Sequence, residues 1–152
     1  MAAAGLLIYV ARHRDEWRGG AAAQTRVFVE EGLQRHFPRD VSPHLIREFA
    51  LRVEQGSLAA RPSKESLERL RDANVQLETN REITAEDWAE YLGTLVEALF
   101  EGRFDPARME ELQVWKSGHD FKAMDKETAE EFLRRLMRVL GASERDGVTP
   151  EQ

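Results

Sequence analysis

Five helix-start signals between residues 42 and 127 constrain the fold of this chain more than any other feature. They are Ser42-Pro43, Ser63 with Glu65, Thr84 with Asp87, Asp105-Pro106 and Asp125 with Glu127. In each, a Ser, Thr or Asp side chain can accept hydrogen bonds from the free N–H groups of a first helical turn. In two of them a proline follows, and proline suits the first helical position because the N–H that it lacks has no partner there. The five signals predict five helices.

Apolar side chains in two segments recur at helical spacing. Between residues 84 and 102 they fall at i, i+3, i+4, i+7, i+8, i+11 and i+12, which places them on one stripe of a helix. They are Trp88, Tyr91, Leu92, Leu95, Val96, Leu99 and Phe100. Between residues 126 and 140 the pattern is repeated by Phe132, Leu133, Leu136, Met137 and Leu140. We therefore predict an all-α fold, a compact bundle of five to seven amphipathic helices.

The first forty residues contain two short runs, GLLIYVA (5–11) and TRVFVE (25–30), that are rich in β-branched and aromatic residues. They could form a short β-hairpin near the N-terminus, because periodicity does not separate a short buried strand from a buried helical segment. Helix is favoured, since Leu33 and Phe37 continue the second run at helical distance from Val29 until Pro38 stops it.

The chain has the length of one ordinary domain, and we predict a single helical domain over residues 1–141. A sub-boundary near 56–62, the stretch GSLAARP, is the alternative. Gly56 is expected to end a helix that begins at residue 43, and Gly141 to end the last helix. Residues 142–152 are predicted to form a disordered tail.

Composition excludes several classes of function. The chain has no cysteine, which rules out thiolate catalysis, Cys-rich zinc sites and disulfides. No apolar run approaches the roughly 20 residues that cross a bilayer, so we expect a cytoplasmic protein without membrane contact. The sequence shows neither a lysine-bearing Gly-rich phosphate loop nor a nucleophile elbow. We expect no cofactor.

His119 and Asp120 stand side by side in VWKSGHDF, after a glycine. They are weak candidates for a metal or general-base site, and a metal-dependent hydrolase around His119 and the helix carboxylates is one functional alternative. The favoured interpretation is a helix end, in which Gly118 stops the helix, His119 lies near its negative pole and Asp120 turns the chain. The paired helix carboxylates, Glu127 and Glu130 among them, are predicted to lie on solvated faces.

Arginines in the N-terminal half suggest a second alternative, a module associated with DNA or RNA. Residues 1–61 hold nine arginines against seven acids, although the whole chain carries a net charge of −6. HFPRDVSPHLIREFALRV could form a helix-turn-helix whose basic side chains meet phosphates. The candidate residues are Arg35, Arg39, Arg47 and Arg52. This hypothesis requires Arg35, Arg39 and Arg47 to be exposed together rather than paired with acids.

Large apolar side chains near element ends are candidates for binding another protein, although the favoured interpretation of each one is that it closes the end of the core. The candidates are Trp17, Met109, Val114 and Trp115. Exposed aromatic groups of this kind can anchor an interface, and a homodimer is one way to bury them. The function predicted from the sequence is therefore a non-catalytic regulatory or adaptor protein that acts through protein–protein interaction.

Overall fold

The computed structural model describes residues 20–80 and 82–147, and within them the chain forms six helices and no strand. The helices are α2 (Gly20–His36), α3 (Pro43–Leu58), α4 (Lys64–Thr79), α5 (Ala85–Leu99), α6 (Pro106–Ser117) and α7 (Lys126–Gly147). The all-α prediction is confirmed.

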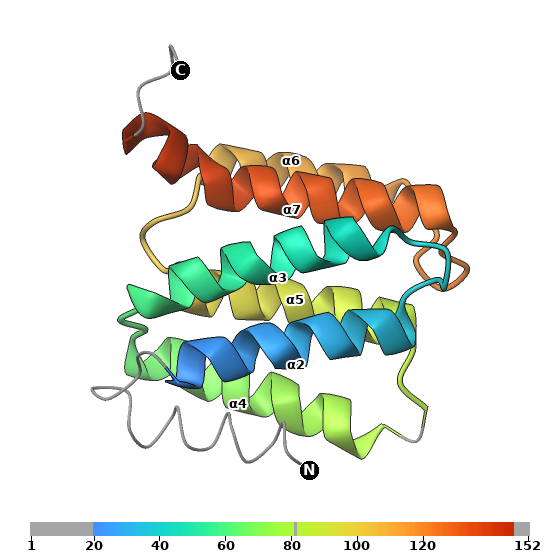
Figure 1. The fold of residues 1–152 in the computed structure, drawn as a ribbon, viewed down its shortest axis with the longest axis horizontal. Coiled ribbons are helices and arrows are strands. Elements are labelled where there is room, and N and C mark those ends of the chain that lie inside the picture. Colours follow the sequence, from blue (N-terminus) through green and yellow to red (C-terminus); the bar gives the residue numbers. More distant parts are fainter. Residues whose placement is uncertain (1–19, 81, 148–152) are drawn as a thin grey trace.

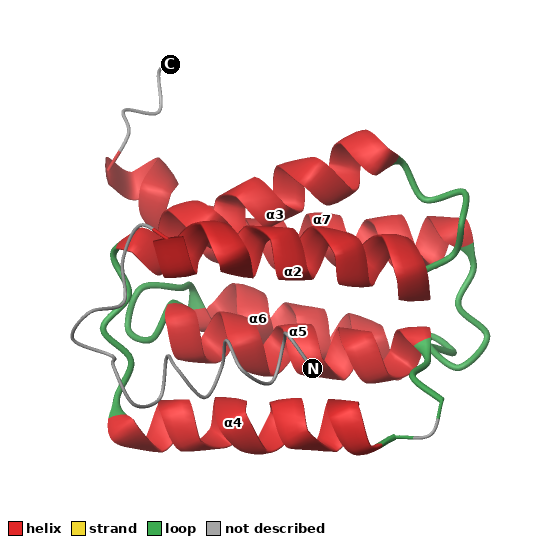
Figure 2. Ribbon diagram, turned by 60° about the horizontal axis from the view of Figure 1, so that its bottom comes forward, coloured by secondary structure: helices red, strands yellow, loops and turns green. Residues whose placement is uncertain are grey.

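The six helices pack as three successive antiparallel hairpins arranged in two layers. In Figure 1, α7, α3 and α2 lie side by side in front, with α6, α5 and α4 behind them. The turns within the pairs α2–α3, α4–α5 and α6–α7 all lie at one end of the molecule, on the right in that view. Figure 2 shows the same layers from another direction, with α4 at one edge. Residues around 40, 83 and 120 therefore share one end of the bundle.

The predicted start signals cap the helices as expected. Ser42 Oγ accepts from Leu45 N at 3.3 Å, and Asp125 Oδ1 accepts from Thr128 N at 2.8 Å. Thr84 forms a full capping box with Asp87, whose carboxylate accepts from the Thr84 N–H in return. The sequence alone predicts these helix starts because each capping side chain bonds only to backbone groups within its own first turn.

The segment TRVFVE lies inside α2, so the hairpin alternative is wrong for that run. Val29 and Leu33 are fully buried, one helical turn apart on the face toward the core. The other run, GLLIYVA, lies outside the described residues.

Two predicted helix ends are wrong, because both helices continue through the glycine. Helix α3 passes Gly56 and ends at Leu58, and α7 passes Gly141 and ends at Gly147. Gly56 is buried, and a Cβ added there would meet the Phe100 ring at 1.8 Å. This glycine permits a close approach between elements and does not mark a terminus. The part of the predicted tail beyond residue 147 lies outside the described residues.

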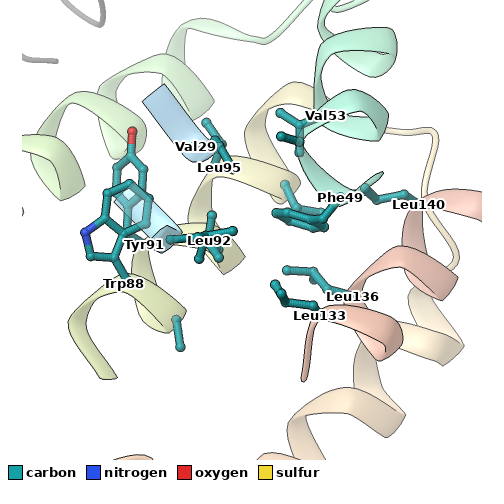
Figure 3. Packing of buried hydrophobic residues seen from close by; sticks show 14 of the residues in the cluster. Val29, Phe49, Val53, Trp88, Tyr91, Leu92, Leu95, Leu133, Leu136 and Leu140 are labelled. Carbon is teal, nitrogen blue, oxygen red and sulfur yellow. The ribbon is translucent and has the colours of Figure 1, made fainter. Parts of the chain in front are cut away.

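One hydrophobic core runs through all six helices and through the segment 56–62, where Ala60 is fully buried. Figure 3 shows Phe49 of α3 between Leu92 and Leu95 of α5 and the leucines of α7. Among the described residues, no helix combines the length and the apolar character that crossing a bilayer needs.

Glu130 departs from the predicted solvated face, since it is only 8 % exposed. Its Oε2 accepts a hydrogen bond from the backbone N–H of Ser42 at 2.8 Å, and Arg134 lies 3.3 Å from its Oε1. This buried carboxylate connects the N-terminal part of α7 to the start of α3. The sequence could not show this, because the two partners are 88 residues apart.

Candidate functional site

The corner at His119 and Asp120 has the geometry of a helix end. Gly118 is the C-cap of α6, and His119 Nδ1 lies 2.8 Å from the carbonyl oxygen of Trp115. Asp120 Oδ1 accepts from the backbone N–H of Lys122 at 3.0 Å, which holds the following turn. Both side chains thus serve the local backbone. Within the described part of the chain, no three His, Asp or Glu side chains are grouped so that they could hold a metal ion.

Trp115 is the centre of the contacts at this end of α6. Its ring lies 4.4 Å from the His119 ring and meets Phe121 edge to face at 5.9 Å, measured between centroids. The guanidinium of Arg135, from α7, stacks over it at 5.0 Å from the ring centroid. A half-buried indole held on these sides has little rotamer freedom left.

The predicted partner-binding residues separate into three groups. Met109 is buried in the core, at 7 % exposure, and so does not belong to a surface. Trp17 lies outside the described residues. Val114 is 68 % exposed, the most of any large apolar side chain that the structure describes, and it directly precedes Trp115. We name Val114, Trp115, His119 and Arg135 together the α6 terminal surface.

Next to this surface lies a shallow cavity of about 470 Å³, between the start of α5 and the end of α6. Lys116 is one of two lysines that line it, and lies 4.0 Å from Glu90 and 5.5 Å from the centroid of the Phe121 ring. Its side chain is only 17 % exposed. Sequence reasoning missed Lys116 and Arg135, because a single Lys or Arg on an amphipathic helix normally lies on a solvated face. The aromatic rings that Lys116 and Arg135 contact belong to other elements, so no local sequence pattern predicts these contacts.

The four candidate arginines for nucleic-acid binding lie in different surroundings. Arg47 Nε lies 3.7 Å from Glu30, so one of the three arginines that the hypothesis needed is paired with an acid. Arg35 lines a cavity between α2 and α4. Arg39 is exposed in the turn before α3. Arg52 is half-buried against α7, where a Cβ on Gly141 would meet it.

Two carboxyl groups have lowered pKa values, and helix capping explains both. The pKa of Glu101 is lowered chiefly by the backbone N–H of Ser63, the N-cap of α4. The pKa of Asp125 is lowered chiefly by the backbone N–H of Thr128 in the first turn of α7. Both shifts therefore have a structural cause rather than the paired environments that tune an acid and a base for catalysis.

Comparisons of this chain with protein-family models, with curated proteins and with solved structures give no match. The function is therefore argued from the contacts of the chain itself.

Proposed function

We propose that this chain is a non-catalytic regulatory or adaptor protein that binds another protein through the α6 terminal surface. The observations that carry the proposal are the exposure of Val114, at 68 %, and the fixed, half-buried position of Trp115, the next residue of the same helix. A single exposed valine is ordinary on a soluble protein. The hot-spot composition comes from Trp115 and Arg135, since tryptophan and arginine are enriched in interface hot spots.

The preorganisation of Trp115 supports the same conclusion. Contacts with His119, Phe121 and Arg135 hold the indole before any partner arrives. Ordering a free side chain at an interface costs about 0.5–1.5 kcal/mol. The Trp115 side chain is already ordered in the free protein, so little of this cost remains when a partner binds. The partner would place an apolar group over Val114 and the open part of the indole.

Affinity capture with a matched pair of variants tests the proposal. The tagged wild-type chain, Val114→Lys and Val75→Lys are each used to capture proteins from lysate of the source cells, with and without nuclease treatment. Val75 is the control, because it is also an exposed valine within a helix, at 50 % exposure on α4. Both substitutions are at exposed positions, where stability changes of about 0.5 kcal/mol or less are expected.

We expect one protein to be retained by the wild type and by Val75→Lys and to be lost with Val114→Lys. Sedimentation of the purified chain shows whether that protein is a second copy of this chain. Equal capture by all three chains would overturn the assignment of the surface. Capture that disappears on nuclease treatment in every case would favour the nucleic-acid alternative instead.

A further inference from the structure

Helix α3 has an outward side that carries two exposed leucines. The helix packs against α2 on one flank, against α7 on the other and against α5 behind, and Figure 1 shows it as the middle helix of the front layer. Leu51 and Leu58 lie on the side that remains, and each is 43 % exposed. The two are seven residues apart, which is the spacing of side chains along the seam between two paired helices.

Most of the exposed apolar groups in the described part of the chain lie on the α2–α3 hairpin. Five large apolar side chains are exposed there, and three of them, Val27, Leu51 and Leu58, belong to α2 and α3. Single exposed apolar side chains are ordinary, whereas a group of them on two packed helices marks a contact surface. We name Val27, Leu51 and Leu58 together the α2–α3 face.

Charged side chains around the α2–α3 face are paired within the chain. Arg26 Nε lies 2.8 Å from Glu54 Oε1. Arg47 Nε lies 3.7 Å from Glu30 Oε2. Both pairs join α2 to α3, and on α3 their members stand on either side of Leu51. A partner at this face therefore needs apolar surface and no excess charge of its own.

The distribution of charge favours a second copy of this chain as that partner. The chain has a net charge of −6, and residues 62–152 hold 13 Lys or Arg against 21 Asp or Glu. Two copies therefore repel each other on most approaches. Residues 20–58 hold five Arg and five Asp or Glu, a net charge of zero. Two copies that meet through α2 and α3 avoid the repulsion, and each supplies the apolar, charge-balanced surface that the other needs.

We infer that two copies of this chain form a dimer through their α2–α3 faces, with the two α3 helices antiparallel about a two-fold axis. In this arrangement Leu51 packs against the partner's Leu58, so both leucines of both copies are covered. Glu48, which is exposed, then lies toward the partner's Arg61, which is also exposed. Parallel α3 helices would instead bring Glu48 beside the partner's Glu48 and align the two helix dipoles.

The dimer is distinguishable from the protein that we propose for the α6 terminal surface. A second copy held on α3 is captured equally by the wild type, Val75→Lys and Val114→Lys, and mass spectrometry identifies it as this chain. Its capture therefore does not bear on the α6 terminal surface, and failure of either proposal leaves the other standing.

Sedimentation of the purified full chain, from micromolar to millimolar concentration, tests the inference. Leu51→Glu places a carboxylate in the contact twice, once from each copy, and Val75→Glu is the control at an exposed position of α4. We expect the wild type and Val75→Glu to associate to twice the mass of one chain. Leu51→Glu should raise the dissociation constant more than about tenfold. A wild type that is monomeric at every concentration, or equal association of all three chains, would overturn the inference.

Exchanging two charges tests the antiparallel arrangement. Glu48→Arg and Arg61→Glu each bring like charges together across the contact, so each should weaken association. The double variant restores opposite charges and should recover the association that each single variant loses. A double variant that associates no better than the single variants would overturn this arrangement.

Cross-linking tests the same surface without changing an apolar residue of the face. The chain has no cysteine, so a single introduced thiol can be linked only to the thiol of another copy. Gln55 is exposed between Leu51 and Leu58, near the two-fold axis, and Val75→Cys and Val114→Cys are the controls. We expect a short bismaleimide to link Gln55→Cys into dimers far more completely than either control. Equal linking of all three, or preferential linking of Val114→Cys, would place the contact elsewhere and overturn the inference.

Discussion

At the scale of single residues, two glycines within helices allow the cost of a close packing contact to be compared with the gain in helix propensity when each is replaced by alanine. Gly56 is buried in α3 with the Phe100 ring against it, whereas no atom lies within 4 Å of a Cβ added at Gly93 in α5. Gly56→Ala forces the ring or the helix to move, and we expect a loss of about 1–3 kcal/mol in the free energy of unfolding. Gly93→Ala should gain about 0.5–1 kcal/mol from helix propensity alone.

Urea unfolding of both variants, with the wild type alongside, measures the two effects under the same conditions. We expect Gly56→Ala to lower the free energy of unfolding and Gly93→Ala to raise it. If both variants gain stability, the packing of Phe100 against α3 is looser than the structure describes.

Residue scale is also where sequence reasoning failed most clearly. The sequence predicts helix ends at Gly56 and Gly141, because a local pattern cannot show the Phe100 ring that packs on Gly56 or the Arg52 side chain that lies near Gly141. For Asn74 a signal was present: it lies at i+4 from Leu70 and at i−3 from Leu77, on the stripe that the core should fill. A polar residue at a core position predicts a buried polar group, and Asn74 is 2 % exposed.

At the scale of elements, Glu101 joins the loop after α5 to the start of α4. One oxygen, Oε1, accepts from the Ser63 backbone N–H and from the Ser66 hydroxyl, both at 2.9 Å. These bonds lower the pKa of Glu101 below its ordinary value of 4.5. The ionised carboxylate therefore stabilises the fold at pH values above about 4.5, and this contribution is lost as the pH falls through the lower folded-state pKa.

We expect Glu101→Gln to lower the free energy of unfolding at pH 7 by about 0.5 kcal/mol, a small value because the group is exposed. The gap between variant and wild type should narrow as the pH falls below 4.5 and through the lower folded-state pKa of Glu101. Urea midpoints measured from pH 3 to pH 8 check this. Glu97→Gln, one turn earlier, leaves both hydrogen bonds in place and should follow the wild type at every pH. A gap that stays constant from pH 8 to pH 3 would assign the effect to something other than the charge.

Element starts were predictable and element partners were not, for the same physical reason. Ser42, Thr84 and Asp125 cap their own helices, so the signal lies within three or four residues of its effect. Glu130 bonds to Ser42 and Arg135 stacks on Trp115, and both contacts exist only once the helices have packed. Of the candidate site, Val114 and Trp115 could be read from the sequence, while the groups that hold Trp115 in place came from the fold.

At the scale of the whole molecule, the single core makes a prediction about cooperativity. Buried residues on both sides of the segment 56–62 belong to one cluster, and Trp88 of α5 packs on Gly32 and Phe28 of α2. A boundary near 56–62 would give α2–α3 and α4–α7 separate unfolding transitions. A shared core should instead make them open together, as small single domains do.

Native-state hydrogen exchange, followed by mass spectrometry through a series of low urea concentrations, distinguishes these cases. We expect the slowest amides of α3, α5 and α7 to share one opening free energy and one dependence on urea. The urea dependence should match that of global unfolding, because it scales with the surface exposed. Amides of α2–α3 that open with a distinctly weaker urea dependence would show a separate unit.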